Sequence, residues 1–228
     1  MATIIPAPTP PTLPIASSED VFPVGRIFCV GRNYVDHIRE MGGEPHRQLP
    51  VFFEKSPTCL VPSGATIPYP TATQELHHEV ELLVALSSGG ANIDAEDVAD
   101  LILGYSVALD MTRRDLQAQA KENGTPWDMA KSFDHAAPAG ALKLMPGKVL
   151  DRGSISLDVN GENRQSGDLN QMVWGLRELI ASLSSLITLR AGDVIMTGTP
   201  AGVGPVSRGD LLEASIEGVG SLEIRYRG

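Results

Sequence analysis

Short apolar runs rich in valine, isoleucine and leucine recur along this chain of 228 residues, and glycine, proline or a Gly-Asp pair bounds most of them. Runs of this length between turn-forming residues are typical of β-strands, because glycine and proline interrupt helices and supply the conformations that tight turns need. Glu217-Gly218, between two such runs, suits a hairpin turn. The clearest predicted strands are 26–30, 79–86, 104–110, 154–160, 193–197, 211–216 and 221–226.

Two short helices can be placed from their ends. Residues 34–41 have helical composition, and Gly42 stands where a helix of that length would stop. Further along, Thr112 with Asp115 three residues later predicts a capping box at the start of a helix. Gly124 predicts the end of that helix.

Apolar residues near the 3.6-residue period predict one longer helix over 169–185, and a short helix is predicted over 95–101. The polar stretch 42–50, flanked by helix-breaking residues, is predicted to be a mobile loop. We find no internal repeat. The sequence therefore predicts an α+β, β-rich fold with one domain over residues 21–228, preceded by an extended proline-rich arm over residues 1–20.

Composition excludes several classes of partner. The net charge of −10 argues against nucleic acid and anionic membranes, because both attract basic surfaces. No apolar run approaches the roughly 20 residues that span a bilayer, and residues 1–18 lack the basic and apolar regions of a signal peptide. Cys29 and Cys59 fit a reducing compartment with two buried thiols, the alternative being a single disulfide. We therefore expect a soluble, cytoplasmic protein.

Three carboxylates are the leading candidates for a metal site. Glu79 and Glu81 project from the same face of their strand, because strand side chains alternate, and Asp110 ends a second apolar strand. Oxygen ligands without cysteine suit Mg²⁺, Mn²⁺ or Ca²⁺, and His77 could contribute beside them. The pattern of the two glutamates alone favours an exposed strand face paired with lysine and arginine. The apolar opposite face of Val80, Leu82, Val84 and Leu86 and the position of Asp110 bring the metal site level with that alternative.

Two pairs at helical spacing could supply catalytic and binding groups. His37 and Glu40 share a helix face, and a carboxylate that holds a histidine in one tautomer makes a general base near neutral pH. By itself this pattern favours a chance pair on an exposed helix. Arg114 and Gln117 share a face of the helix after Asp110, where they could hold polar groups of a substrate or simply face solvent.

Two further residues are weaker candidates. Lys131 lies in a semi-apolar segment, where a lysine is either functional or keeps its charge in water while its stem packs on apolar groups; the sequence favours the second. The glycine-rich stretch 197–204 is not a phosphate-binding P-loop, because no Gly-Lys-Ser/Thr follows. Its backbone N–H groups and Thr199 could still meet an anion, the alternative being a tight loop between strands.

Six ordered motifs together resemble those of the fumarylacetoacetate hydrolase family, over about residues 25–225. Six in the same order are far more specific than any one of them. They are CVGRNYVDHIREMG (29–42), LHHEVEL (76–82), ALDMTRRDLQ (108–117), PWDMAKSFD (126–134), NGENRQ (160–165) and GDVIMTGTPAGVGP (192–205).

This resemblance implies a mixed β-sandwich roll, a homodimer, and roles for ten residues. By resemblance, Mg²⁺ or Mn²⁺ is held by Glu79, Glu81 and Asp110. His37 and Glu40 match a catalytic dyad on a lid that orders when substrate binds, and Lys131 matches a lysine beside the metal. The positions that match substrate-binding residues are Arg32, Arg114, Gln117 and Thr199.

The implied activity is metal-dependent hydrolysis of the C–C bond of a 3-acylpyruvate. The proline-rich start and the segments around residues 108–117 and 126–135 look most like family members that convert fumarylpyruvate to fumarate and pyruvate in gentisate degradation. Two alternatives use the same site, namely oxaloacetate decarboxylation and keto–enol isomerisation. A third is a non-catalytic scaffold with a structural Ca²⁺ site.

Overall fold

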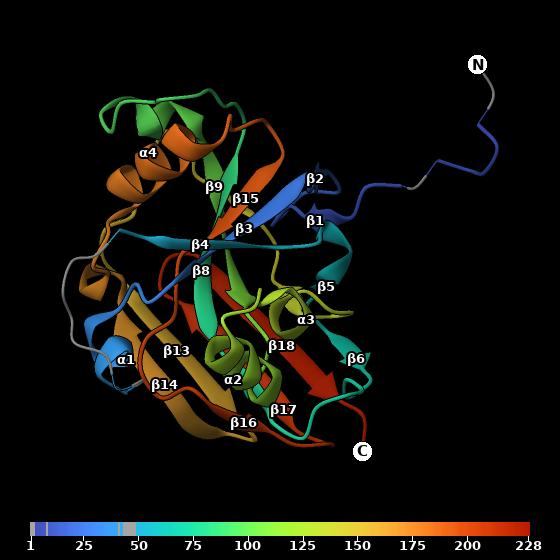
Figure 1. Ribbon diagram of the computed structural model, residues 1–228. Helices are drawn as coiled ribbons and strands as arrows, with labels where there is room; N and C mark the ends of the chain where they lie inside the picture. The colour runs from blue at the N-terminus through green and yellow to red at the C-terminus, as the bar shows by residue number, and fades with distance from the viewer. Residues whose placement is uncertain (1–2, 8, 41, 43–48) are drawn as a thin grey trace.

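The structure is a computed structural model that describes residues 3–7, 9–40, 42 and 49–228 (Figure 1). The larger of its sheets is mixed, because β15 runs parallel to β3 and antiparallel to β8. Its strands among the described residues follow the order β4 (Val51–Lys55), β3 (Arg26–Gly31), β15 (Asp193–Met196), β8 (Val80–Leu86), β9 (Ile102–Leu109), β11 (Ala137–Ala139) and β5 (Leu60–Pro62), with β12 (Lys143–Leu144) beside β9.

A second sheet packs against the first. Its strands are, in order, β14 (Glu162–Asp168), β13 (Ser154–Val159), β17 (Leu211–Ile216), β18 (Gly220–Tyr226) and β6 (Ala65–Ile67). Every second side chain of β13, β17 and β18 is buried, and β17 and β18 contact β9 of the larger sheet. The apolar faces of the two sheets thus form the core, and the predicted β-rich α+β fold is confirmed.

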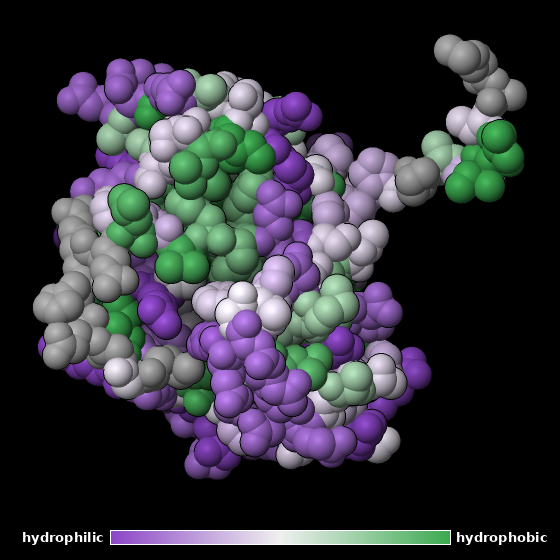
Figure 2. Space-filling view, in the orientation of Figure 1, coloured by the Kyte–Doolittle hydropathy of each residue, from purple (hydrophilic) through white to green (hydrophobic). Residues whose placement is uncertain are grey.

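Smaller strands complete the β-structure. β7 (Leu76–His78) lies between β10 (Thr112–Arg113) and β16 (Gly204–Val206). β1 (Thr12–Pro14) pairs with β2 (Val21–Pro23) in a hairpin that buries Leu13. The predicted limit of the N-terminal arm at residue 20 therefore falls between two paired strands. In Figures 1 and 2 the described residues before β1, 3–7 and 9–11, extend away from the body.

The helices are short. They are α1 (Val35–Glu40), α2 (Arg114–Asn123), α3 (Asp128–Lys131) and α4 (Leu176–Leu186), with 3₁₀ turns η1 (Pro57–Cys59), η2 (Asp97–Leu101) and η3 (Leu169–Gln171). Figure 1 shows α2 and α3 next to each other on one side of the sheets. Gly124 ends α2 with φ +63°, as predicted. Most of the loop predicted over 42–50 lies outside the described residues.

The single helix predicted over 169–185 is wrong. The chain forms η3, leaves helical geometry, and starts α4 only at Leu176. Asn33 explains the break, because its backbone carbonyl accepts the N–H of Val173 at 2.8 Å and its Oδ1 accepts the N–H of Trp174 at 2.8 Å. These bonds hold two backbone N–H groups that a continuous helix would have used.

The capping box predicted at Thr112 is also wrong. Thr112 belongs to β10, where it pairs with His77, and its hydroxyl donates to the Asp110 carbonyl at 3.1 Å. Asp115 instead accepts from the hydroxyl of Thr73 at 2.7 Å and the N–H of Gln74 at 2.9 Å. The strand pairing therefore outweighs the local capping preference.

Candidate active site around a carboxylate cluster

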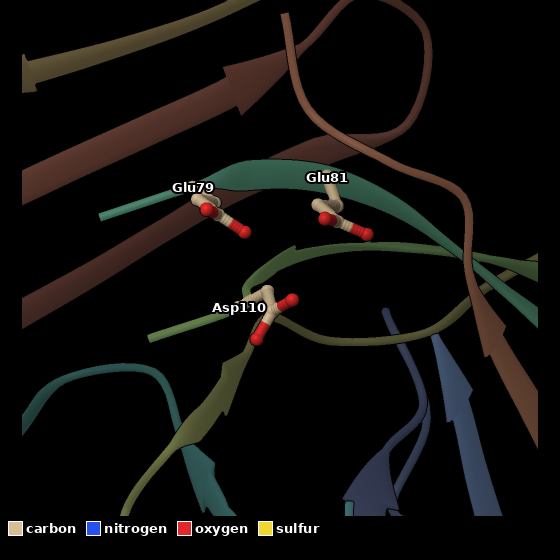
Figure 3. Close-up of side chains that lie close together, drawn as sticks. All are labelled: Glu79, Glu81 and Asp110. Carbon is tan, nitrogen blue, oxygen red and sulfur yellow. The ribbon is translucent and has the colours of Figure 1, made fainter. Parts of the chain in front are cut away.

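Glu79, Glu81 and Asp110 form a buried cluster (Figure 3). Ligand atoms of the three side chains lie within 4.8 Å of one another. Glu79 joins β7 to β8, Glu81 lies on β8, and Asp110 follows β9. The Asp110 N–H donates to the Glu79 carbonyl at 2.8 Å, which fixes the two residues side by side. Burial of all three rules out the exposed strand face that the pattern alone allowed.

Cations surround one end of this cluster. The Lys131 ammonium donates to Glu79 Oε2 and to Asp110 Oδ2, both at 2.7 Å, and Arg114 forms an ion pair with Glu79 Oε1. Burial alone would raise the pKa of Glu79, but the charges of Lys131 and Arg114 outweigh it and lower that pKa. Burial alone would lower the pKa of Lys131, but the charges of Asp110 and Glu79 outweigh it and raise that pKa.

Glu81 has a different environment. Its Oε2 accepts the Gly198 N–H at 2.8 Å, and no ion pair of Glu81 is found among the described residues. Burial, and then the charges of Asp110 and Glu79, raise its pKa well above the usual range. A buried carboxylate such as Glu81, without a cation of the described chain to pair with, fits a divalent cation such as Mg²⁺ or Mn²⁺.

Lys55 is a component of the site that sequence reasoning missed. Its ammonium is buried and lies 2.8 Å from Asp110 Oδ1. It also donates to the carbonyls of Met111, at 3.1 Å, and Lys131, so Lys55 ties Asp110 to the chain around Lys131. The only signal was a lysine at the end of an apolar run, which does not differ from an ordinary strand end.

His37 and Glu40 form the pair that their spacing predicted. His37 Nδ1 lies 3.1 Å from Glu40 Oε2, and Glu40 Oε1 accepts the Gly202 N–H at 3.0 Å. His37 is buried, unlike the chance pair on an exposed helix. Because Glu40 occupies Nδ1, the other ring nitrogen, Nε2, is the one available to act on a substrate.

One pocket, open to solvent, joins these groups. Nine of the ten predicted site residues line it. The exception is Glu40, which contacts Nδ1 of His37 outside the pocket lining. Arg114 Nη1 donates to Gln117 Oε1 at 2.6 Å, so these two residues are held together on α2. The lining comprises Val30, Gly31, Arg32, His37, Phe53, Glu79, Glu81, Asp110, Arg114, Gln117, Lys121, Trp127, Lys131 and Thr199.

Gln165, a second missed residue, positions Thr199. The Gln165 amide donates to Thr199 Oγ1 at 2.8 Å, and its carbonyl oxygen accepts the Val80 N–H at 3.0 Å. Gln165 lies in the NGENRQ motif but carries no recognisable chemical pattern of its own. Gly198 and Gly202 have φ of +96° and +94°, which glycine adopts without strain. The glycine-rich stretch is thus a shaped loop around Thr199.

His77 is not part of the cluster. Its Nδ1 lies 3.4 Å from Arg114 Nε, and its backbone pairs with Thr112 on one side and Pro205 on the other. Burial and the charge of Arg114 lower the pKa of His77 to about 4. His77 is therefore a neutral neighbour of Arg114.

Comparisons with known proteins show what this chain is similar to. The family model described as Fumarylacetoacetate (FAA) hydrolase C-terminal matches residues 26–226. A fumarylpyruvate hydrolase of Ralstonia sp is 42% identical over 173 residues, 76% of this chain and 90% of that protein. The mitochondrial oxaloacetate tautomerase FAHD1 of Mus musculus is 41% identical over 203 residues, 88% of this chain and 91% of that protein.

A solved structure extends the likeness to nearly the whole chain. The crystal structure of fumarylpyruvate hydrolase from Pseudomonas aeruginosa, in complex with Mn²⁺ and pyruvate, has a TM-score of 0.95 and 42% identity, covering 99% of both chains.

In the described part of this chain, no helix has the length and apolar character needed to cross a membrane.

Proposed function

Because the chain belongs to the fumarylacetoacetate hydrolase family, we propose that it is a metal-dependent hydrolase of 3-acylpyruvates, with fumarylpyruvate as its substrate and fumarate and pyruvate as products. One observation carries this proposal. The buried carboxylate cluster and His37, which is paired with Glu40, line the same pocket, so a cation and a general base can act on one bound molecule.

The cluster would hold the cation. Glu79, Glu81 and Asp110 are its ligands, and Mg²⁺ or Mn²⁺ when bound supplies positive charge that polarises the 2-oxo and carboxylate oxygens of an acylpyruvate. Arg114 and Gln117 lie beside this cluster, joined by their own hydrogen bond. They would bind the carboxylate of the pyruvoyl end and orient the molecule along the pocket.

His37 would activate water. Its Nε2 takes one proton as the water oxygen bonds to the distal carbonyl carbon, and Glu40 stabilises the imidazolium that results. The C3–C4 bond then breaks, its electron pair stays on C3, and the proton held by His37 passes to C3 to complete pyruvate. The carbonyl carbon keeps the water oxygen and leaves as the carboxylic acid.

Lys131 would contribute charge near the reacting carbonyl. Glu79 and Asp110 hold its ammonium in place and keep it protonated, as its raised pKa indicates. A fixed ammonium with two of its protons already engaged still has one proton for the oxyanion that forms when water adds. Its position is set before substrate binds, so little reorganisation is needed during the reaction.

Substitution of His37 tests the proposal. His37→Asn should abolish hydrolysis of fumarylpyruvate and acetylpyruvate while calorimetry still shows Mn²⁺ binding, because His37 is not a ligand. His135→Asn is the matched control, since His135 does not line the pocket. Normal hydrolysis by the His37→Asn protein would refute the role of the pair.

A second candidate is tautomerisation of oxaloacetate, and the 41% identical oxaloacetate tautomerase FAHD1 favours it. Tautomerisation moves a proton but adds no water across a carbonyl. Comparing kcat/KM of the Mg²⁺-loaded protein for fumarylpyruvate, acetylpyruvate and oxaloacetate separates the two. The same panel tests oxaloacetate decarboxylation, which releases CO₂.

Three further parts of the proposal rest on the resemblance. We propose a place in gentisate degradation, a cytoplasmic location and a homodimer. The first is supported by the fumarylpyruvate hydrolases among the relatives. Sedimentation velocity of the purified protein tests the dimer, which a single species at the monomer mass would contradict.

A further inference from the structure

Three polar side chains of α2 line the pocket in a row. Arg114, Gln117 and Lys121 are spaced i, i+3 and i+7, so they share one face of the helix. Two of them have partners, because Arg114 pairs with Glu79 and bonds to Gln117. The Lys121 ammonium has no hydrogen-bonded or ionic partner among the described residues. Lys121 is therefore the cation of this face that is open to a ligand.

Aromatic and basic neighbours define the surroundings of Lys121. Its Nζ lies 5.3 Å from the ring centroid of Trp127, which packs 6.0 Å from Phe53, and both rings line the pocket. Partial burial, and then the charges of Arg114 and Arg32, lower the pKa of Lys121. Arg32 lines the same pocket, and both side chains remain accessible to solvent.

The spacing along α2 fits a molecule with an anion at each end. A helix rises about 1.5 Å per residue, so Arg114 and Lys121 are separated by about 10 Å along the axis. This separation is comparable with the length of an acylpyruvate that carries a second carboxylate. Arg114 marks the end at the carboxylate cluster, and Lys121 marks the opposite end.

We propose that Lys121, together with Arg32 of the same pocket, is a specificity-determining residue that binds a carboxylate at the far end of the acyl group. The substrates selected are then acylpyruvates with an anionic acyl end over those with a short neutral one. A cation held against an indole ring is partly desolvated, which strengthens its hydrogen bond to a carboxylate. This inference rests on the proposed hydrolysis of acylpyruvates.

The test is a change in preference between two substrates. Fumarylpyruvate carries the second carboxylate and acetylpyruvate does not, so the ratio of their kcat/KM values reports on Lys121. In Lys121→Met the ratio should fall about tenfold, mainly through KM for fumarylpyruvate, as expected for one charge-assisted hydrogen bond. Lys121→Arg should restore most of it. Lys148→Met, a lysine outside the pocket, should leave the ratio unchanged.

Two results would overturn the assignment. Either an unchanged ratio in Lys121→Met, or an equal loss toward both substrates, would show that Lys121 does not read the acyl end. If the unaltered protein turns over neither substrate, the proposed function has failed. The ratio of their dissociation constants on the Mn²⁺-loaded protein, measured by calorimetry for the same variants, then still decides the role of Lys121.

Discussion

Replacing Glu81 with glutamine removes one negative charge from the carboxylate cluster and keeps the shape of the side chain. Glutamine can still accept the Gly198 N–H that Glu81 accepts at 2.8 Å. The ligand atoms of the cluster lie within 4.8 Å of one another. At that distance and an effective dielectric constant of about 20, two like charges repel by about 3 kcal/mol.

Part of this repulsion is offset by the charge of Lys131. We therefore expect Glu81→Gln to stabilise the metal-free protein at pH 8 by about 2 kcal/mol, a rise of about 4–8 °C in Tm. The gain should shrink toward pH 5. Because the folded pKa of Glu81 is raised, the metal-free wild type loses stability as pH rises from the ordinary glutamate value of about 4.3 toward that raised pKa.

Glu79→Gln is the matched contrast, with the same substitution two residues away and the opposite expected sign. Glu79 pairs with Lys131 and Arg114, so losing its charge leaves Arg114 without its ion-pair partner and the buried Lys131 with Asp110 alone, at a cost of about 3–5 kcal/mol. Differential scanning fluorimetry in EDTA measures both variants. The wild type should gain about 2.7 kcal/mol with Mn²⁺ at 100 times its dissociation constant, and Glu81→Gln should lose most of that gain.

The reasoning on this cluster is refuted by either of two outcomes. One is a lower Tm for Glu81→Gln than for wild type in EDTA at pH 8. The other is a full Mn²⁺-dependent rise in Tm for that variant. Either outcome would mean that Glu81 is a structural carboxylate whose charge other groups of the protein already compensate.

Two further predictions concern the supports of the site. Asp115→Ala should lower the free energy of unfolding by about 1–2 kcal/mol near pH 7, because Thr73 and the Gln74 N–H lose their acceptor. Burial alone would raise the pKa of Asp115, but the hydrogen bonds from these groups outweigh it and lower that pKa. In urea titrations the difference in stability between the variant and wild type should therefore narrow only as pH falls below the ordinary aspartate value of about 3.9. Gly202→Ala should reduce kcat at least tenfold with Mn²⁺ binding intact. The φ of Gly202 is +94°, and a Cβ there would collide with the Arg164 carbonyl and displace the N–H that binds Glu40. An unchanged kcat would show that the loop need not hold Glu40.

Local patterns predicted the strands at the centre of the two main sheets, namely β3, β8, β9, β13, β15, β17 and β18, because alternation and turn residues are properties of a few neighbours along the chain. They failed at residues 172–175, where Asn33, far away in sequence, takes the backbone N–H groups of a helix. They failed at Thr112 for the same reason, since its pairing partner His77 lies on another strand. In both places a long-range contact outweighed a correct local preference.

In the candidate site, too, the sequence reveals residues with a local pattern and hides those that depend on long-range contacts. Glu79 and Glu81 were visible because their spacing alone puts them on one face, and His37 and Glu40 because theirs suits a helix. Lys55 was invisible, since its role depends on reaching Asp110 through the fold. Residues whose chemistry comes from burial among distant partners carry no local signal.

The place of β15 in the larger sheet has a consequence for the order of folding. This strand, from residues 193–196, inserts between β3 and β8, whose residues were made much earlier. During synthesis the centre of that sheet therefore stays open until nearly the whole chain has emerged, and Glu81 waits for Gly198 to supply its hydrogen bond. Because Glu81 gains this hydrogen bond only after β15 has paired, we expect metal ions to bind after that step, and so to slow unfolding and leave the rate of folding unchanged.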